Sequence, residues 1–166
     1  ILNLPYPGGP EIERLAINGT LKYPFKPAVV KKDPFSFSFS GLKTAVLYTV
    51  KGQNTDLSIK SPVSLEMMQD IAASFQHAAF SSVISKTLEA AKKYHCQNII
   101  FGGGVTNNQT LRKMFQCENG NLNYIWPAAG LSLDNAAMIA GLGYHKFKSG
   151  HVDDVATLEA LTSIAF

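Results

Sequence analysis

The amino-acid sequence predicts an α/β fold built around one long central helix. Residues 64–94 repeat apolar side chains near the helical period, which is typical of a helix with a broad buried face. Residues 97–101 and 122–126 are short apolar runs closed by Gly102 and Pro127, and a helical pattern follows each of them. With 46% apolar residues among 166, the chain is long enough for one globular core.

The first 34 residues are expected to be mostly loop with one short helix. Proline and glycine crowd residues 1–10, which indicates a loop. Residues 11–18 form a short helix, because Pro10 stands at its start and Gly19 just past its end. Residues 22–34 are basic and interrupted by proline, so they read as loop with at most a short strand.

Residues 35–40 alternate strictly between phenylalanine and serine, and this alternation predicts a strand with its phenylalanines on the core face. Gly41 ends that strand, a helix follows at residues 42–50, and a polar linker occupies residues 51–61. In the long helix of residues 64–94, His77 and Phe80 are expected to be packing or surface residues rather than ligands.

The most informative segment is a run of three glycines between the strand of residues 97–101 and an amphipathic helix at residues 109–115. Glycine lets a backbone approach a ligand closely, and the N–H groups of a helix's first turn attract anions. A phosphate or nucleotide cradle fits this segment, and an ordinary tight turn fits the glycines equally well. Asn107 and Asn108 either cap the helix or offer an amide to a purine or ribose. The pattern is neither a Walker A loop nor a full dinucleotide fingerprint.

Residues 133–135 lead into an alanine-rich helix at residues 136–148, and Asp134 among them suits a metal ligand, a base or the helix N-cap. One carboxylate is not a metal site, and the four histidines show no His-x-x-x-His or His-Glu-x-x-His spacing, so a zinc-protease helix finds no support. Loops that follow the strands of an open α/β sheet meet in one crevice, and we expect residues 7–13, 102–108 and 133–135 to converge there.

Composition sets broad limits on the protein's setting. A net charge of +3 is compatible with an acidic ligand such as a nucleotide or RNA. Cys96 and Cys117 form neither a zinc pair nor a disulfide framework, so we expect a reducing cytoplasm and a small buried residue at Cys96. No apolar run reaches the ~18 residues of a membrane span, so no membrane partner is expected.

Five motifs, in one order along the chain, closely resemble the TsaD/Gcp family. They are YPGGP at residues 6–10, FSFSGLKT at 37–44, DIAASFQ at 70–76, GGVTNNQTLR at 103–112 and DNAAMIA at 134–140. Together they are far more specific than any single glycine loop. The resemblance covers almost the whole chain and weakens only after residue 150.

This resemblance implies the two-lobed actin-like ATPase fold (ASKHA, RNase H-like). Residues 1–150 would be the C-terminal portion of its nucleotide-binding lobe, incomplete on the N-terminal side, and residues 151–166 a helical tail. The implied enzyme is a tRNA N6-adenosine threonylcarbamoyltransferase. It moves threonylcarbamoyl from threonylcarbamoyl-AMP to N6 of adenosine 37, beside the anticodon, in tRNAs that read ANN codons. The fragment alone is expected to be inactive.

The same resemblance implies the site residues. Those expected to bind the substrate nucleotide are Gly9, Glu13, Gly103, Gly104 and Asn108. Asp134 would be one ligand of a divalent metal ion, iron or zinc. The family's other two ligands are histidines of a His-x-x-x-His helix, which this sequence lacks, and no side chain here is assigned as a catalytic base.

Partners and alternatives also follow from the resemblance. It implies a cytoplasmic protein that works with tRNA, ATP, a TsaB-like paralogue as heterodimer partner and a TsaE-like ATPase, and with no membrane. Two other functions stay open. An actin-like small-molecule kinase would use the same loop to phosphorylate a sugar or carboxylate, whereas a non-catalytic TsaB-like scaffold would have little use for the glycine loop and Asp134.

Overall fold

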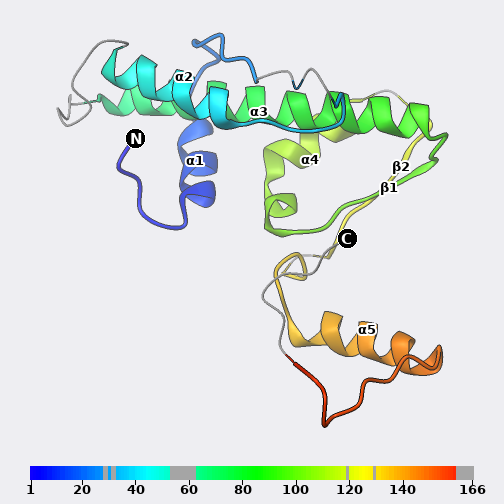
Figure 1. The fold of residues 1–166 in the computed structure, drawn as a ribbon. Coiled ribbons are helices and arrows are strands. Elements are labelled where there is room, and N and C mark those ends of the chain that lie inside the picture. The colour runs from blue at the N-terminus through cyan, green and yellow to red at the C-terminus, as the bar shows by residue number, and fades with distance from the viewer. Residues whose placement is uncertain (28–29, 31–32, 53–62, 119, 129, 160–166) are drawn as a thin grey trace. The chain divides into compact units, whose positions relative to one another are not determined.

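The structure, a computed structural model, describes residues 1–27, 30, 33–52, 63–118, 120–128 and 130–159. It is a mixed α/β structure that divides into two compact units, Ile1–Ser132 and Leu133–Phe166 (Figure 1). Each unit is described by itself. The linker expected at residues 51–61 lies almost entirely outside the described residues.

Helix α3 (Leu65–Lys93) is the longest element of the first unit, and the expectation of a central helix at residues 64–94 is confirmed. Its N-cap is Ser64, whose side chain accepts a hydrogen bond from the Met67 backbone N–H. Buried residues run from Asp70 to Ala91, so neighbouring elements cover α3 along most of its length. Phe80 is buried and His77 is exposed, as expected of packing and surface residues.

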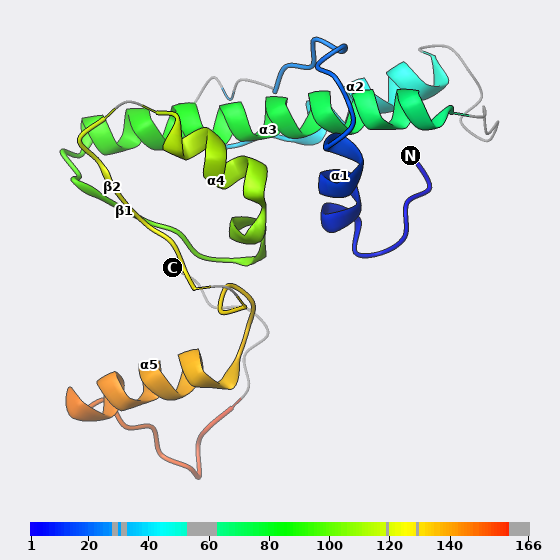
Figure 2. The same cartoon turned by 180° about the vertical axis from the view of Figure 1, so that it is seen from behind.

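Helix α1 (Gly8–Ala16) stands across α3 (Figures 1 and 2). It begins three residues earlier than predicted, because Pro7 serves as the N-cap residue and Pro10 sits inside the first turn, where a missing N–H costs nothing. The loop after α1 approaches α3 very closely: a Cβ added to Gly19 would lie 2.0 Å from the Gln69 carbonyl oxygen. Only glycine fits there.

The contact between this loop and α3 is polar as well as tight. Asp70 is 4% exposed and accepts hydrogen bonds from the backbone N–H of Thr20 at 2.9 Å and from its hydroxyl at 3.0 Å. Lys22 forms an ion pair with the same carboxylate at 3.5 Å. Ser74, one turn further along α3, accepts from the Tyr23 backbone N–H. These bonds fix the end of α1 on α3.

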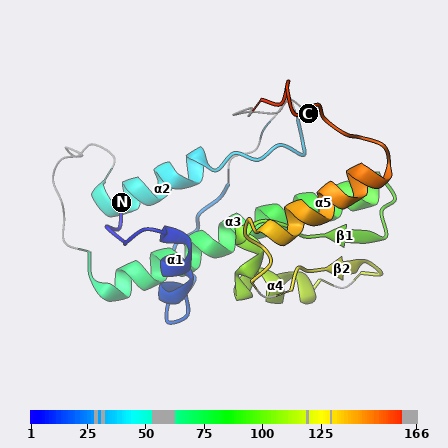
Figure 3. The ribbon, with the colours of Figure 1, turned by 90° about the horizontal axis from the view of Figure 1, so that it is seen from below.

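Helix α2 (Ser40–Lys51) runs beside the first half of α3 and buries Leu42 and Val46 (Figure 3). The expected helix at residues 42–50 is confirmed, but the strand expected at residues 35–40 is wrong, since only Ser38 forms a single β-bridge. Asp33 instead accepts from Phe35 N–H and the Ser36 hydroxyl, which closes a turn. The two strands of the described sheet pair with each other and not with residues 35–40.

Strands β1 (Asn98–Ile100) and β2 (Asn123–Ile125) form a parallel pair with Ile99 opposite Tyr124. Helix α4 (Gln109–Gln116) packs on α3, and both strands and both helices fall within one or two residues of the predicted ranges. The core between them is aromatic and aliphatic: Phe101 stacks on Trp126 with ring centroids 3.6 Å apart, beside buried Phe80, Leu111 and Phe115.

Burial in this core raises the pKa of the Tyr124 hydroxyl, with the nearby Glu118 carboxylate as a second cause.

The second unit consists of helix α5 (Ala136–Lys148) and the chain that follows it. The bounds of α5 match the prediction, and none of its residues is buried. Residues 151–159 contain a turn at 155–157 and no helix, whereas residues 160–166, where the predicted tail helix would continue, lie outside the described residues. The expected division of the chain at residue 150 stays a prediction.

Two smaller expectations also meet the structure. Cys96 is exposed, so the expectation of a buried residue is wrong. It follows His95, whose positive φ of 53° comes directly after Tyr94, the C-cap residue of α3. Among the described residues, no helix is long and apolar enough to span a membrane.

Substitution of Gly19 by alanine tests the close approach of the loop to α3. The new methyl group meets a backbone carbonyl, which cannot move without shifting the helix, so we expect Gly19→Ala to lower the free energy of unfolding by about 1–3 kcal/mol. Urea unfolding measures this. Gly120→Ala, where an added Cβ meets nothing within 4 Å, is the matched control, and an equal effect of both substitutions would contradict the account.

Asp70 predicts a pH dependence of stability. The Thr20 backbone N–H, followed by its hydroxyl and Lys22, holds the pKa of Asp70 below its ordinary value of 3.8. Folding therefore favours the ionised form, and this stabilisation is fully present above pH 3.8 and is lost as the pH falls through the lower native pKa. Urea unfolding of the wild type and Asp70→Asn across pH 2–7 should show a difference that shrinks below about pH 4. A constant difference would refute it.

Candidate functional site

The glycine loop after β1 is open to solvent and has one residue in the left-handed region. Gly103 has φ +86°, a conformation that L side chains rarely adopt, and a Cβ added to Gly102 or Gly103 would meet nothing within 4 Å. A short 3-10 helix, Gly104–Asn107, then leads into α4. Thr106 closes the turn, donating from its N–H and hydroxyl to the Gly103 carbonyl. A ligand can therefore approach this backbone closely.

Asn108 is the N-cap of α4, so one of the two roles expected for it is confirmed. Its Oδ1 accepts from the Leu111 backbone N–H at 3.0 Å, and its Nδ2 donates to Oε1 of Gln76 at 2.8 Å. Gln76 comes from the buried face of α3, and sequence reasoning did not assign it to the site. One feature of the sequence could have indicated its role: a glutamine follows the small residues Ala72, Ala73 and Ser74 in a mostly apolar part of the helix.

Glu13 reaches the same place from α1. Its Oε1 accepts from the backbone N–H of Gln109, the first residue of α4, at 2.7 Å, which joins residues 96 positions apart. Gly9 lies one turn before Glu13 on α1, with open space where a Cβ would stand. The structure thus brings Glu13 and Asn108 together at the start of α4, next to Gly103 and Gly104.

Two further residues hold the loop, and the sequence analysis did not single out either. Arg112 donates from Nε to the Thr106 carbonyl at 2.7 Å and from an Nη to the Pro127 carbonyl at 3.2 Å, and its guanidinium lies 4.9 Å from the Trp126 ring centroid. Ser132 donates to Asn107 Oδ1 at 2.7 Å. The chain segments that follow β1 and β2 therefore meet, as expected of two parallel strands.

Asp134 belongs to the second unit, and its place relative to the glycine loop is not defined. Asn135, rather than Asp134, caps α5 by accepting from the Met138 N–H at 3.0 Å. Within the part of the chain that the structure describes, the exposed Asp134 carboxylate makes no hydrogen bond or ion pair. It is therefore available as one oxygen ligand. The described residues contain no group of three or more candidate metal ligands.

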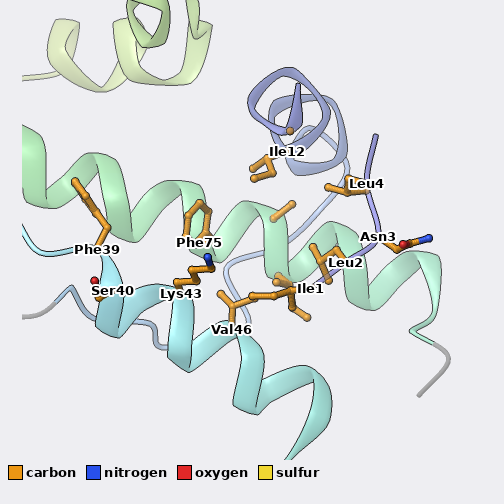
Figure 4. Close-up of a pocket in the computed structure, with 13 residues that line it drawn as sticks. Ile1, Leu2, Asn3, Leu4, Ile12, Phe39, Ser40, Lys43, Val46 and Phe75 are labelled. Atoms are coloured by element: carbon orange, nitrogen blue, oxygen red, sulfur yellow. The ribbon is translucent and has the colours of Figure 1, made fainter. Parts of the chain in front are cut away.

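A separate hollow of about 750 Å³ lies between α1, α2 and α3 (Figure 4). Its lining is mostly apolar and includes Ile12, Val46 and Phe75, with the chain start at Ile1 along one side. Lys43 reaches this hollow from α2, and no acidic residue is among those that line it. Neither the glycine loop nor Asn108 takes part, so the hollow is distinct from the cluster at the start of α4.

Comparison with known proteins gives a consistent result. Residues 1–141 match the family described as "TsaD: tRNA N6-adenosine threonylcarbamoyltransferase". Curated relatives with the name tRNA N6-adenosine threonylcarbamoyltransferase include one from Protochlamydia amoebophila, 59% identical over 98% of this chain and 47% of its own length. One from Chlamydia pneumoniae is 49% identical over 89% of this chain and 42% of its own. One from Thermosipho africanus is 43% identical over 99% and 48%. The chain spans about half the length of these relatives.

Replacing Asn108 tests how much its two side-chain hydrogen bonds contribute to the free energy of unfolding. Asn108→Ala removes the helix cap, worth about 1 kcal/mol, and leaves the buried Gln76 amide without its partner, which costs a further ~1–3 kcal/mol. Asn135→Ala removes a cap and a hydrogen bond from Nδ2 to the Leu133 carbonyl, and it is the matched control because Leu133 and Met138 are both exposed. We expect chemical denaturation to show a clearly larger loss for Asn108→Ala. Equal losses would mean that the bond to Gln76 adds nothing.

Proposed function

The chain belongs to the tRNA N6-adenosine threonylcarbamoyltransferase family, and from this we propose that it forms the C-terminal part of the enzyme that makes threonylcarbamoyladenosine in tRNA. The proposed reaction transfers threonylcarbamoyl from threonylcarbamoyl-AMP to N6 of adenosine 37 in tRNAs that read ANN codons, and AMP leaves. The small parallel sheet and the long α3 are compatible with part of a lobe of the actin-like fold.

The observation that carries this proposal is the family match over residues 1–141, which includes all five sequence motifs. The geometry supports it independently at one point. Glu13 stands three residues after the motif at residues 6–10, Asn108 belongs to the motif at residues 103–112, and they meet at the first turn of α4. An accidental resemblance in two distant segments gives no reason for their side chains to converge.

In this proposal the cluster at the start of α4 binds the nucleoside of threonylcarbamoyl-AMP. The open space at Gly103 and the exposed Gly104 let the loop approach it, Asn108 offers an amide hydrogen, and the Glu13 carboxylate accepts from a ribose hydroxyl. Gly9 leaves room beside Glu13 for the sugar. These side chains orient the substrate: they place the mixed anhydride so that the adenosine amine attacks its carbonyl carbon.

Asp134 is proposed as one ligand of a divalent metal ion, iron or zinc. Its exposed carboxylate, without a bond to other described residues, fits one ligand position. The remaining ligands would come from outside the described residues, because these hold no cluster of three. A bound metal supplies Lewis-acid stabilisation of charge that develops on the reacting group.

The wider setting of the enzyme is proposed on the family alone. A TsaB-like paralogue would form a heterodimer with it, a TsaE-like ATPase would use ATP to reset the site, and the complex would act on tRNA in the cytoplasm without a membrane. Both protein partners are needed in a test of activity, so that a missing component is not mistaken for an inactive enzyme.

The reaction and the role of Asp134 are tested together. Full-length enzyme with its partners, ATP, bicarbonate and labelled threonine is expected to label unmodified tRNA. Asp134→Asn should lower the rate by more than the ~10–100-fold that loss of a residue supporting a metal ligand costs. Asp153→Asn, which changes another exposed carboxylate of the second unit, should leave the rate unchanged. Failure to label tRNA, with a sugar or acetate phosphorylated instead, would favour a kinase.

A further inference from the structure

Gln76 is a buried amide on a face of α3 that is otherwise largely apolar. Its side chain is 5% exposed, and Ala72, Ala73 and Phe80 on the same helix are buried with it. A buried amide lowers stability unless it is hydrogen-bonded, so a leucine would be the simpler choice for this position. The bond that Gln76 makes is the one to Asn108, in which its Oε1 accepts from Nδ2 at 2.8 Å.

This bond fixes which way the Asn108 amide faces. The Oδ1 of Asn108 accepts from the Leu111 N–H at 3.0 Å, while Nδ2 donates to Gln76. A flipped amide would place Nδ2 against the Leu111 N–H and Oδ1 against the Gln76 oxygen, and both contacts would be repulsive. Gln76 and Leu111 together therefore allow one orientation.

One hydrogen of Asn108 remains for a ligand. A side-chain amide has two N–H donors and one oxygen, and the two bonds above use the oxygen and one donor. Asn108 is half-buried and borders the open glycine loop, so the second N–H has access to a molecule bound there. The Glu13 carboxylate lies close by, because it accepts a hydrogen bond from the backbone N–H of Gln109, the residue after Asn108.

We propose that Gln76 is a positioning residue for the nucleoside site: its oxygen holds the Asn108 amide so that the second N–H points at an acceptor atom of the adenosine. The inference rests on the proposed function, because it assigns the ligand of Asn108 as the nucleoside of threonylcarbamoyl-AMP. It differs from a purely structural role, in which Gln76 would only tie α4 to α3.

The test measures binding of adenosine to the full-length enzyme by calorimetry. Adenosine carries no charge, so substitutions that alter charge near the site do not repel it. Gln76→Leu keeps the size of the side chain and removes the acceptor, and binding should weaken by about 3- to 10-fold, the equivalent of one hydrogen bond. Gln76→Glu keeps an acceptor at the same place and should restore most of the affinity. Ser74→Ala removes a buried hydrogen-bonding group two residues before Gln76, on a different side of α3, and should bind adenosine normally.

A double-mutant cycle separates positioning from general damage. Once Asn108 is alanine, Gln76 has nothing to position, so adding Gln76→Leu should cause no further loss of adenosine affinity. Unchanged affinity in Gln76→Leu, or a full additional loss in the double variant, overturns the inference while the proposed function stands. A wild-type enzyme that binds no adenosine overturns the nucleoside site itself, and this inference with it.

Discussion

The arrangement of the first unit depends on α3 as one unbroken helix. Its 29 residues span about 43 Å, and it packs against different partners at its two ends. The first half packs against α2 and holds α1 through Asp70 and the close approach at Gly19, and the second half holds α4 and the strands through Phe80 and Ile84. Because a helix is stiff over this length, the separation between α1 and α4 is set by α3. That separation lets Glu13 reach the first N–H of α4.

The same arrangement explains why the candidate site lies where it does. Gln76 lies on α3 between Asp70 and Phe80, and it bonds Asn108, the residue before the one whose N–H donates to Glu13. Each of the three helices contributes one polar group to the first turn of α4: a carboxylate from α1, an amide from α3 and the cap residue of α4 itself. A change in the packing of α1 on α3 would therefore alter the surroundings of Asn108 even if the glycine loop itself were unchanged.

The sequence could predict features that depend on one segment of the chain. It could not predict features that depend on a contact with a distant segment. The period of residues 64–94 and the cap role of Asn108 each depend on a single segment, and both predictions were confirmed. Alternation at residues 35–40 is a necessary feature of a half-buried strand, but pairing depends on a neighbouring strand that the segment does not specify. Phe37 and Phe39 are accordingly 46% and 42% exposed and stack on each other. Gln76 was missed for the same reason, because its partner lies 32 residues away.

The structure also bears on which part of a nucleotide the glycine loop can bind. A phosphate cradle was one of the two interpretations of this loop, and it depended on free N–H groups at the start of the following helix. Three of those four groups are already bonded: Asn108 to the Val105 carbonyl, Gln109 to Glu13 and Leu111 to the Asn108 side chain. A phosphate at this end of α4 would have to displace a carboxylate and would be repelled by it. An uncharged ribose meets no such repulsion, and its hydroxyl groups can donate to Glu13. The loop therefore suits the nucleoside of a nucleotide better than its phosphates, and the charge of Glu13 is the reason.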